Sequence, residues 1–171
     1  AIVTERIDDH PELSKLTCDE WNHAVIVPKE HPLLECMNPL SIEDLASFPL
    51  ITYEFAFNQG SSIARAFNKA HLDNPDVVLS AADTDVLKTY VRLGLGVGLM
   101  AKMAFDPEKD ADLELVDAAH LFEPSPIWIA VRSDTYLRGY TYDFIEMFSP
   151  KLTRDVVDRI LYTPVVEDFS I

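Results

Sequence analysis

The residues best suited to bind a small molecule lie in the segment EFAFNQGSS, residues 54–62. Its candidate ligand-binding residues are Phe55, Phe57, Asn58, Gln59 and Ser61. The polar ones place neutral donors at an expected helix start, where free backbone N–H groups and the helix dipole favour an anion. The segment therefore predicts a carboxylate or sulfate site that uses no Lys or Arg. The same residues suit an ordinary helix entry with Ser61 as N-cap and an apolar staple, so both interpretations stay open.

A second helix start adds one more candidate, Thr84. Asp83 or Thr84 is expected to cap a helix that ends at Gly94. In α/β sheets, ligands bind beyond the carboxyl ends of the strands, beside helix N-termini. The two helix starts are therefore the positions at which a small anion is expected.

Two other motifs are rejected on their spacing. The glycines of residues 94–98 follow a helix and lead into a strand, which is the reverse of a dinucleotide fingerprint. They predict a helix stop and a tightly packed strand. The acidic stretch from Asp106 to Glu114 lacks the Gly at position six and the Glu at position twelve of a calcium loop. It predicts a solvated acidic turn.

Motifs for catalysis or metal binding are missing from the sequence. The five histidines include no i, i+4 pair and no HExxH, and no G-x-S-x-G elbow occurs. His23, in a strand-like run, suits either an exposed position or a satisfied core position. The sequence predicts no catalytic residue, no metal site and no cofactor.

Alternating strands and helices must position the candidate residues, and they predict the α/β class. Strands are expected at 2–4, 21–27, 50–53, 77–79, 96–100, 113–116 and 127–131. Helices are expected after Ser41 and at 62–72, 84–93, 134–148 and 153–161. The side chains expected to point inward from two of these helices are Val86, Leu87, Tyr90, Val91 and Leu93, and Tyr136, Leu137, Tyr140, Phe144, Ile145 and Phe148.

Composition narrows the functional classes. The 171 residues hold 14 Lys and Arg against 29 Asp and Glu, a net charge of −15. Binding to nucleic acid or to an anionic membrane by this chain is disfavoured, because both need clustered basic residues. No apolar run approaches the ~20 residues of a membrane span. With no signal peptide and with Cys18 and Cys36 expected as thiols, the sequence predicts a cytoplasmic location.

Three long runs carry a family resemblance: ADTDVLKTYVRLGLGVGLMAKMAFDP (82–107), YTYDFIEMFSPKLTRDVVD (140–158) and PLITYEFAF (49–57). They resemble the effector-binding domain of LysR-type transcriptional regulators, in the CysB/Cbl branch that governs cysteine biosynthesis and sulfur assimilation. The resemblance extends from about residue 1 to about residue 161. Members of the family carry a winged helix-turn-helix, a linker helix and a C-terminal effector domain.

The resemblance implies a fold of two Rossmann-like α/β lobes, similar to type 2 periplasmic binding proteins, with lobe I incomplete here. Residues 1–17 correspond to the end of lobe I and a crossover. Residues 18–122 correspond to lobe II, and residues 123–171 to the return crossover and the C-terminal helices of lobe I. No DNA-binding domain is expected within the chain.

The resemblance also implies ligands and further site residues. Sulfate, thiosulfate and O- or N-acetylserine bind between the lobes in this branch. Thr4 matches a threonine that contacts the anion, and Trp21 matches a tryptophan that lines the cleft. Asn58 replaces a threonine but still donates through its amide. Asp19 replaces a tyrosine near Trp21, and Glu54 replaces another threonine and is expected to face solvent, since a carboxylate pointing inward repels an anion.

The expected partners are a small anionic effector, DNA through a separate N-terminal domain, and further copies of the chain in a homodimer or homotetramer. Because part of lobe I is missing, the 171 residues alone are expected to bind effector weakly or not at all. Two other functions are considered. One is a solute-binding protein of the periplasmic type, and the other is a small α/β enzyme, for which no turnover is expected.

Overall fold

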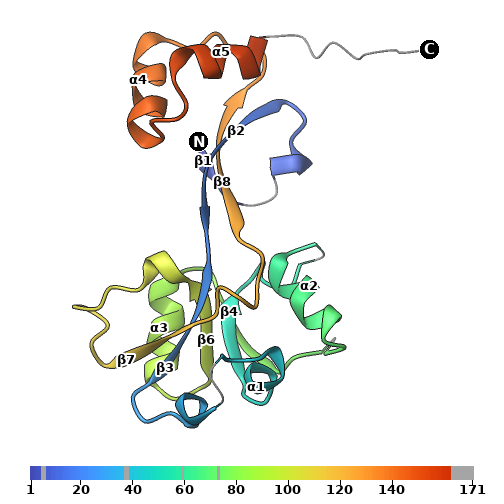
Figure 1. Cartoon of the computed structure of the whole chain (residues 1–171), viewed down its shortest axis with the longest axis vertical. Coiled ribbons are helices and arrows are strands. Elements are labelled where there is room, and N and C mark those ends of the chain that lie inside the picture. Colours follow the sequence, from blue (N-terminus) through green and yellow to red (C-terminus); the bar gives the residue numbers. More distant parts are fainter. Residues whose placement is uncertain (5–6, 37–38, 59, 73, 163–171) are drawn as a thin grey trace. The chain divides into compact units, whose positions relative to one another are not determined.

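The computed structural model describes residues 1–4, 7–36, 39–58, 60–72 and 74–162. The chain divides into two compact units, Ala1–Glu20 with Pro126–Ile171, and Trp21–Ser125 (Figure 1). Thr4 belongs to the first unit, and the other described candidate residues belong to the second. Gln59 lies outside the described residues.

The first unit is built on a three-stranded sheet with the order β1-β8-β2. Its elements are β1 (Ile2–Val3), the 3-10 turn η1 (Ile7–Asp9), β2 (Leu13–Trp21), β8 (Ser125–Arg132), α4 (Gly139–Phe148) and α5 (Arg154–Tyr162). β1 runs antiparallel to β8, with Ile2 opposite Ile129. The Arg154 guanidinium lies 4.6 Å from the centre of the Tyr142 ring, which links the two helices.

The sequence missed β2 and misplaced the inward face of α4. α4 begins at Gly139 rather than at 134, after a turn in which the Thr135 N–H donates to the Arg132 carbonyl. Four aromatic side chains expected inward are exposed, by 42–76%: Tyr136, Tyr140, Phe144 and Phe148. Tyr142 and Ile145 are buried in α4. Apolar residues occur on every face of this helix, so its periodicity selects no single stripe.

The second unit carries a five-stranded mixed sheet with the order β5-β4-β6-β3-β7. The strands are β3 (His23–Pro28), β4 (Leu50–Tyr53), β5 (Val77–Ala81), β6 (Val97–Ala101) and β7 (Leu113–Asp117). β4 is parallel to β5 and to β6, whereas β3 is antiparallel to β6 and β7. The helices are α1 (Ile42–Ala46), α2 (Ser62–Lys69) and α3 (Thr84–Arg92), with 3-10 turns η2 (Pro32–Glu35) and η3 (Lys102–Ala104).

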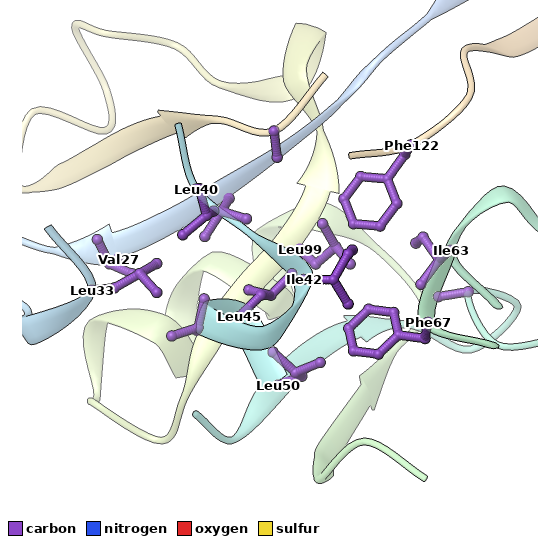
Figure 2. Close-up of a cluster of buried hydrophobic side chains, with 14 residues drawn as sticks. Val27, Leu33, Leu40, Ile42, Leu45, Leu50, Ile63, Phe67, Leu99 and Phe122 are labelled. Carbon is purple, nitrogen blue, oxygen red and sulfur yellow. The ribbon is translucent and has the colours of Figure 1, made fainter. Parts of the chain in front are cut away.

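Helices cover both faces of this sheet (Figure 1). On one face, Leu45 of α1 and Phe67 of α2 join a buried cluster with strand residues such as Val25 (Figure 2). On the other face, Leu87 of α3 packs with Ile26. Successive strand residues point to opposite faces, so Val25 and Ile26 enter different clusters. The predicted α/β class is thereby built as three layers.

Local signals placed the starts of α1, α2 and α3 correctly. Ser41 caps α1 in a capping box, with its hydroxyl accepting from the Asp44 N–H and the Asp44 carboxylate accepting from the Ser41 N–H. Gly94 ends α3 with φ +73°, a left-handed conformation that glycine adopts without strain. The expected helix stop at the glycine run is confirmed.

The glycines at 96 and 98 are the tightly packed positions that the sequence predicts. A Cβ at Gly96 would lie 2.5 Å from the Pro49 carbonyl oxygen, and a Cβ at Gly98 would lie 2.6 Å from the Ile26 side chain. Both distances are shorter than van der Waals contact. The strand therefore approaches its neighbours too closely for any side chain at these two positions.

The substitution Gly96→Ala is expected to lower the free energy of unfolding by about 1–3 kcal/mol, since the added methyl group forces backbone atoms apart. Urea denaturation followed by circular dichroism measures the loss. Gly139→Ala is the control, because a Cβ there meets no atom within 4 Å. Equal stability of the two variants would contradict the close packing at Gly96.

Candidate functional site

Two helix starts meet at one edge of the second unit's sheet. β5, β4 and β6 run parallel, so their carboxyl ends lie at the same edge. The loop after β4 leads into α2, and the loop after β5 leads into α3. The Glu54 N–H donates to the Ala81 carbonyl at 3.3 Å and joins the two loops directly. This edge is where a ligand of an α/β sheet is expected.

Trp21 lies at the same edge. β3 runs antiparallel to β6, with His23 opposite Ala101, so the start of β3 accompanies the carboxyl end of β6. Trp21 ends β2 and precedes His23 by two residues. The topology thus places Trp21, the loop 54–61 and Thr84 along one border of the sheet.

The loop between β4 and α2 descends through successive backbone turns. The N–H groups of Ala56, Asn58 and Ser61 donate to the carbonyls of Tyr53, Phe55 and Asn58. Phe55 stacks on Tyr53 at 5.1 Å, and Phe57 meets the edge of Phe67 at 5.3 Å. Both phenylalanines therefore anchor the loop by packing. Asn58 and Glu54 are exposed, so Glu54 faces solvent as expected.

Ser61 is the N-cap of α2, as the sequence predicts. Its hydroxyl accepts from the Ala64 N–H at 3.0 Å and donates to the Ala56 carbonyl at 2.5 Å. The helix-entry interpretation of this segment is confirmed for Ser61. Its hydroxyl is engaged within the fold and is therefore not free to donate to a ligand.

Removing this cap by Ser61→Ala is expected to destabilise the protein by about 0.5–2 kcal/mol, the usual cost of a lost N-cap. The hydroxyl also ties the loop at Ala56, so a value near the upper end is expected. Thermal unfolding followed by circular dichroism measures it, with Ser62→Ala one position further along as the control. Equal melting temperatures for the two variants would contradict the capping role.

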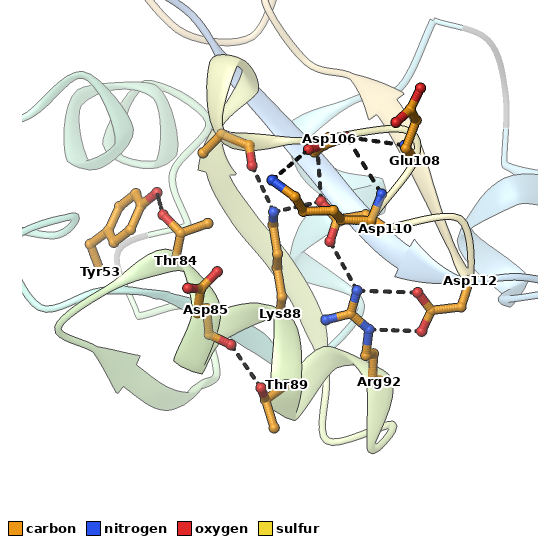
Figure 3. A network of polar contacts seen from close by, with 12 residues as sticks. Tyr53, Thr84, Asp85, Lys88, Thr89, Arg92, Asp106, Glu108, Asp110 and Asp112 are labelled. Atoms are coloured by element: carbon orange, nitrogen blue, oxygen red, sulfur yellow. Dashed lines mark hydrogen bonds and ion pairs between the residues drawn. The ribbon is translucent and has the colours of Figure 1, made fainter.

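Thr84 connects the start of α3 to two strand ends. Asp83, rather than Thr84, is the N-cap, and its carboxylate accepts from the Val86 N–H at 2.9 Å. The Thr84 hydroxyl lies 2.9 Å from the Tyr53 hydroxyl (Figure 3). The Tyr53 hydroxyl also accepts from the Ala101 N–H at 3.4 Å. This chain of polar contacts fixes α3 against β4 and β6 at the edge.

A surface pocket of about 530 Å³ borders the same loop. Its walls come from the end of β4, the loop, α2 and the segment before β5, and include Glu54, Phe57, Arg65 and Asn68. Arg65 is paired across this region with Glu123 at 2.6 Å. The pocket reaches the loop on its α2 side.

Trp21 and His23 form a buried pair that the sequence did not identify. Trp21 is 6% exposed and His23 is 3% exposed, and their ring centres lie 4.4 Å apart. Phe122 packs on the other side of His23 at 5.2 Å. Burial lowers the pKa of His23 to about 4, so the ring is neutral at pH 7. The alternation of strand residues, which puts 21 and 23 on one face, is the signal by which the sequence analysis could have found the pair.

Acidification is expected to destabilise the protein through His23. The unfolded imidazole titrates near 6.5 and the folded one near 4, so the unfolded state binds more protons between these values. Stability therefore falls as the pH drops from 6.5 to 4, by about 3 kcal/mol in total for this group. Urea denaturation across this range, compared with His23→Phe, measures it. Parallel pH profiles for the two proteins would contradict this expectation.

A network of ion pairs connects α3 to the segment that contains Asp110 and Asp112. Lys88 donates to Asp110 at 2.5 Å and to the Ala104 carbonyl at 2.6 Å (Figure 3). Arg92, one turn further along α3, contacts Asp110 at 2.9 Å and binds Asp112 through two nitrogens. Burial raises the pKa of Asp110, but hydrogen bonds from Lys88, the Asp106 backbone and Arg92 hold it below its ordinary value.

This network corrects two predictions from the sequence. The acidic stretch is not a wholly solvated turn, because Asp110 is 2% exposed. The inward stripe of α3 holds Leu87 and Val91 as expected, but Lys88 is also buried there. Three residues of the expected stripe are exposed: Val86, Tyr90 and Leu93. Among the described residues, no group of three or more acidic, His or Cys side chains is arranged to hold a metal ion.

The structure thus brings together six of the candidate residues within one unit. They are Trp21, Phe55, Phe57, Asn58, Ser61 and Thr84. Thr4 follows β1 in the other unit, and its role in the site stays a prediction. In the ranges that the structure describes, no helix is both long and apolar enough to cross a bilayer.

The three-layer unit, its partner sheet and the polar loops at one edge match a known family. The family model of the LysR substrate binding domain matches residues 1–153. This chain belongs to the LysR substrate-binding-domain family. The expected family and the α/β fold class are thereby confirmed for this LysR domain.

Full-length regulators are similar to the LysR domain over nearly all of its residues. The HTH-type transcriptional regulator CysB of Burkholderia cenocepacia is 48% identical over 161 residues, covering 94% of this chain and 51% of the regulator. CysB of Haemophilus influenzae is 51% identical over 159 residues, covering 93% of this chain and 48% of the regulator. The LysR domain spans about half the length of these curated relatives, which are transcriptional regulators rather than enzymes.

A solved structure supports the same assignment. The crystal structure of the cofactor-binding domain of the Cbl transcriptional regulator superposes with a TM-score of 0.84 at 35% identity. The match covers 95% of this LysR domain and 71% of that chain. CysB and Cbl regulators are therefore its close homologues, as the sequence runs indicated.

Proposed function

We propose that this chain is the effector-sensing domain of a LysR-type regulator of cysteine biosynthesis and sulfur assimilation. Its ligand is a small anion: sulfate, thiosulfate, or O- or N-acetylserine. The ligand biases the conformation or the subunit packing of the regulator, since an effector shifts only states that it binds differently. The meeting of two helix starts and Trp21 at one sheet edge is the observation that carries this proposal.

The chemistry of that edge favours an anion held by neutral groups. The starts of α2 and α3 supply unpaired backbone donors and positive dipole ends. The nearby cations Arg65 and Lys102 form ion pairs with Glu123 and Asp117. The site therefore relies on Asn58, backbone N–H groups and, by the resemblance, Thr4, rather than on an unpaired basic residue.

The remaining properties follow from the proposed regulator. The ligand lies between two lobes, with lobe I incomplete within these residues. DNA is bound by a separate helix-turn-helix domain, which suits a chain of net charge −15. The regulator works in the cytoplasm as a homodimer or homotetramer. A helix-turn-helix encoded upstream of residue 1 distinguishes it from a solute-binding protein of the periplasmic type.

Isothermal calorimetry tests the proposed function. O-acetylserine, N-acetylserine, sulfate and thiosulfate are titrated in turn into the intact gene product, and in parallel into the 171-residue chain. Binding of at least one ligand to the intact product is expected, with weak or no binding to the shorter chain. No heat from any of the four ligands with the intact product would overturn the proposal.

A further inference from the structure

Two buried ring nitrogens at the candidate edge lack hydrogen-bond partners in the described part of the chain. Neither Trp21 Nε1 nor His23 Nδ1 has a hydrogen-bond partner among the residues that the structure describes. Both side chains are more than nine-tenths buried. Buried polar atoms in native proteins are almost always hydrogen-bonded, and an unpaired one loses the hydration it had in the unfolded chain. The pair therefore calls for a partner that the described residues do not supply.

His23 is linked to the first turn of α2 through Phe122. His23 contacts Phe122, which belongs to the same buried cluster as Ile63, the second residue of α2 (Figure 2). The next residue, Glu123, forms an ion pair with Arg65 of that turn. Residues 122 and 123 thus lie between His23 and the helix start at which the anion is proposed to bind, one through the shared cluster and the other through an ion pair.

The chemistry of the two rings indicates which functional group their ligand must carry. An indole N–H can only donate a hydrogen bond, so the ligand must present an acceptor to Trp21. A neutral imidazole donates from one ring nitrogen. With its proton on Nδ1, His23 offers a second donor to the same ligand. A sulfate or carboxylate oxygen has enough lone pairs to accept both.

We propose that His23 is a second ligand-contacting residue beside Trp21, and that the two rings donate to one oxygen of a bound oxyanion. The inference rests on the proposed function and deepens it, because it adds a specificity-determining residue to that site. It explains how a site without an unpaired cation holds an anion: two directed N–H donors in a buried, aromatic environment, where each hydrogen bond to a charged acceptor is stronger than in water.

Nuclear magnetic resonance tests the pair without any substitution. The chain holds two tryptophans, Trp21 and Trp128. The indole N–H signal of Trp21 reports on the pair, and that of Trp128, on β8, is the internal control. Sodium sulfate is titrated into the ¹⁵N-labelled intact gene product. A saturable shift of the Trp21 signal and of the His23 ring nitrogens is expected, with the Trp128 signal unmoved.

Two substitutions separate hydrogen bonding from shape. His23→Phe and Trp21→Phe keep an aromatic ring but remove the ring nitrogen. Each is expected to weaken sulfate binding about tenfold or more, the usual effect of losing one hydrogen bond to a charged acceptor. Trp128→Phe is the matched control and is expected to bind as the wild type does. Circular dichroism checks that each variant is folded.

The outcomes are distinct. Absence of binding by all four ligands overturns the proposed function and this inference together. Binding heat with unmoved Trp21 and His23 signals overturns the inference alone and assigns the pair to a structural water. Unchanged affinity in a folded His23→Phe protein overturns it as well.

Discussion

Replacing Lys88 with methionine is expected to lower the free energy of unfolding by about 3–5 kcal/mol, the usual cost of breaking a buried ion pair. The substitution leaves Asp110, 2% exposed, without its closest cation and deprives the Ala104 carbonyl of its donor. Arg92 continues to contact one Asp110 oxygen. Urea denaturation followed by circular dichroism at pH 7 gives the difference.

Two further variants decide whether the buried charge is the cause. Lys109→Met removes an exposed lysine that pairs with Asp106 in the same loop, and is expected to cost below about 1 kcal/mol. Adding Asp110→Asn to Lys88→Met is expected to restore part of the stability, because the uncompensated charge is gone. Equal losses for Lys88→Met and Lys109→Met would contradict the buried pair.

The network also makes the stability of the protein fall at low pH. The pKa of Asp110 is held below its ordinary value in the folded protein, so its stabilising effect is complete above about pH 4 and is lost as the pH falls further. Because Lys88 and Arg92 both belong to α3, loosening them also frees the helix whose first residue, Thr84, contacts Tyr53. Stability and the geometry of the candidate edge are coupled through this helix.

Replacing Phe67 with alanine is expected to cost about 3–5 kcal/mol, since a large, fully buried ring is replaced by a cavity. Phe67 is 1% exposed and belongs to the buried cluster that α1 and α2 form with the sheet. It also supports Phe57, whose ring meets it edge-on at 5.3 Å in the candidate loop. Chemical denaturation measures the loss of stability.

The exposed phenylalanine of α4 is the control. Phe144 is 49% exposed, so Phe144→Ala is expected to change stability by less than about 1 kcal/mol. Since Phe67 holds the loop as well as the core, Phe67→Ala is also expected to weaken sulfate binding to the intact gene product at temperatures where it stays folded. Unaltered affinity would show that the loop does not depend on this packing.

The starts of α1, α2 and α3 and the end of α3 were predictable from the sequence because they depend on local chemistry. Ser41, Ser61 and the pair at 83–84 announce helix caps through side chains that bond to N–H groups three residues away. Gly94 marks a left-handed stop. The strand that the sequence analysis missed, β2, carries no such local signal. Its run LSKLTCDEW mixes charged and apolar residues, and its pairing beside β8 comes from far along the chain.

The buried face of a helix and the partners of a buried charged side chain were harder to predict. α4 has apolar residues all round, so only its packing shows that Tyr142 and Ile145 are the buried ones. Asp110 looks like one more acid of a solvated turn until α3 brings Lys88 and Arg92 to it from about twenty residues upstream.

The family, the α/β class, the caps of α1, α2 and α3 and the loop that offers neutral donors could be inferred from the amino-acid sequence, because they depend on residue type at short spacing or on long matching runs. The folded structure was needed to show that this loop, Thr84 and Trp21 share one sheet edge, and that Lys88, Asp110 and His23 are buried. Strand order and burial arise from contacts between distant segments. A buried charge or ring is paired or left unpaired by those contacts, and no local spacing encodes them.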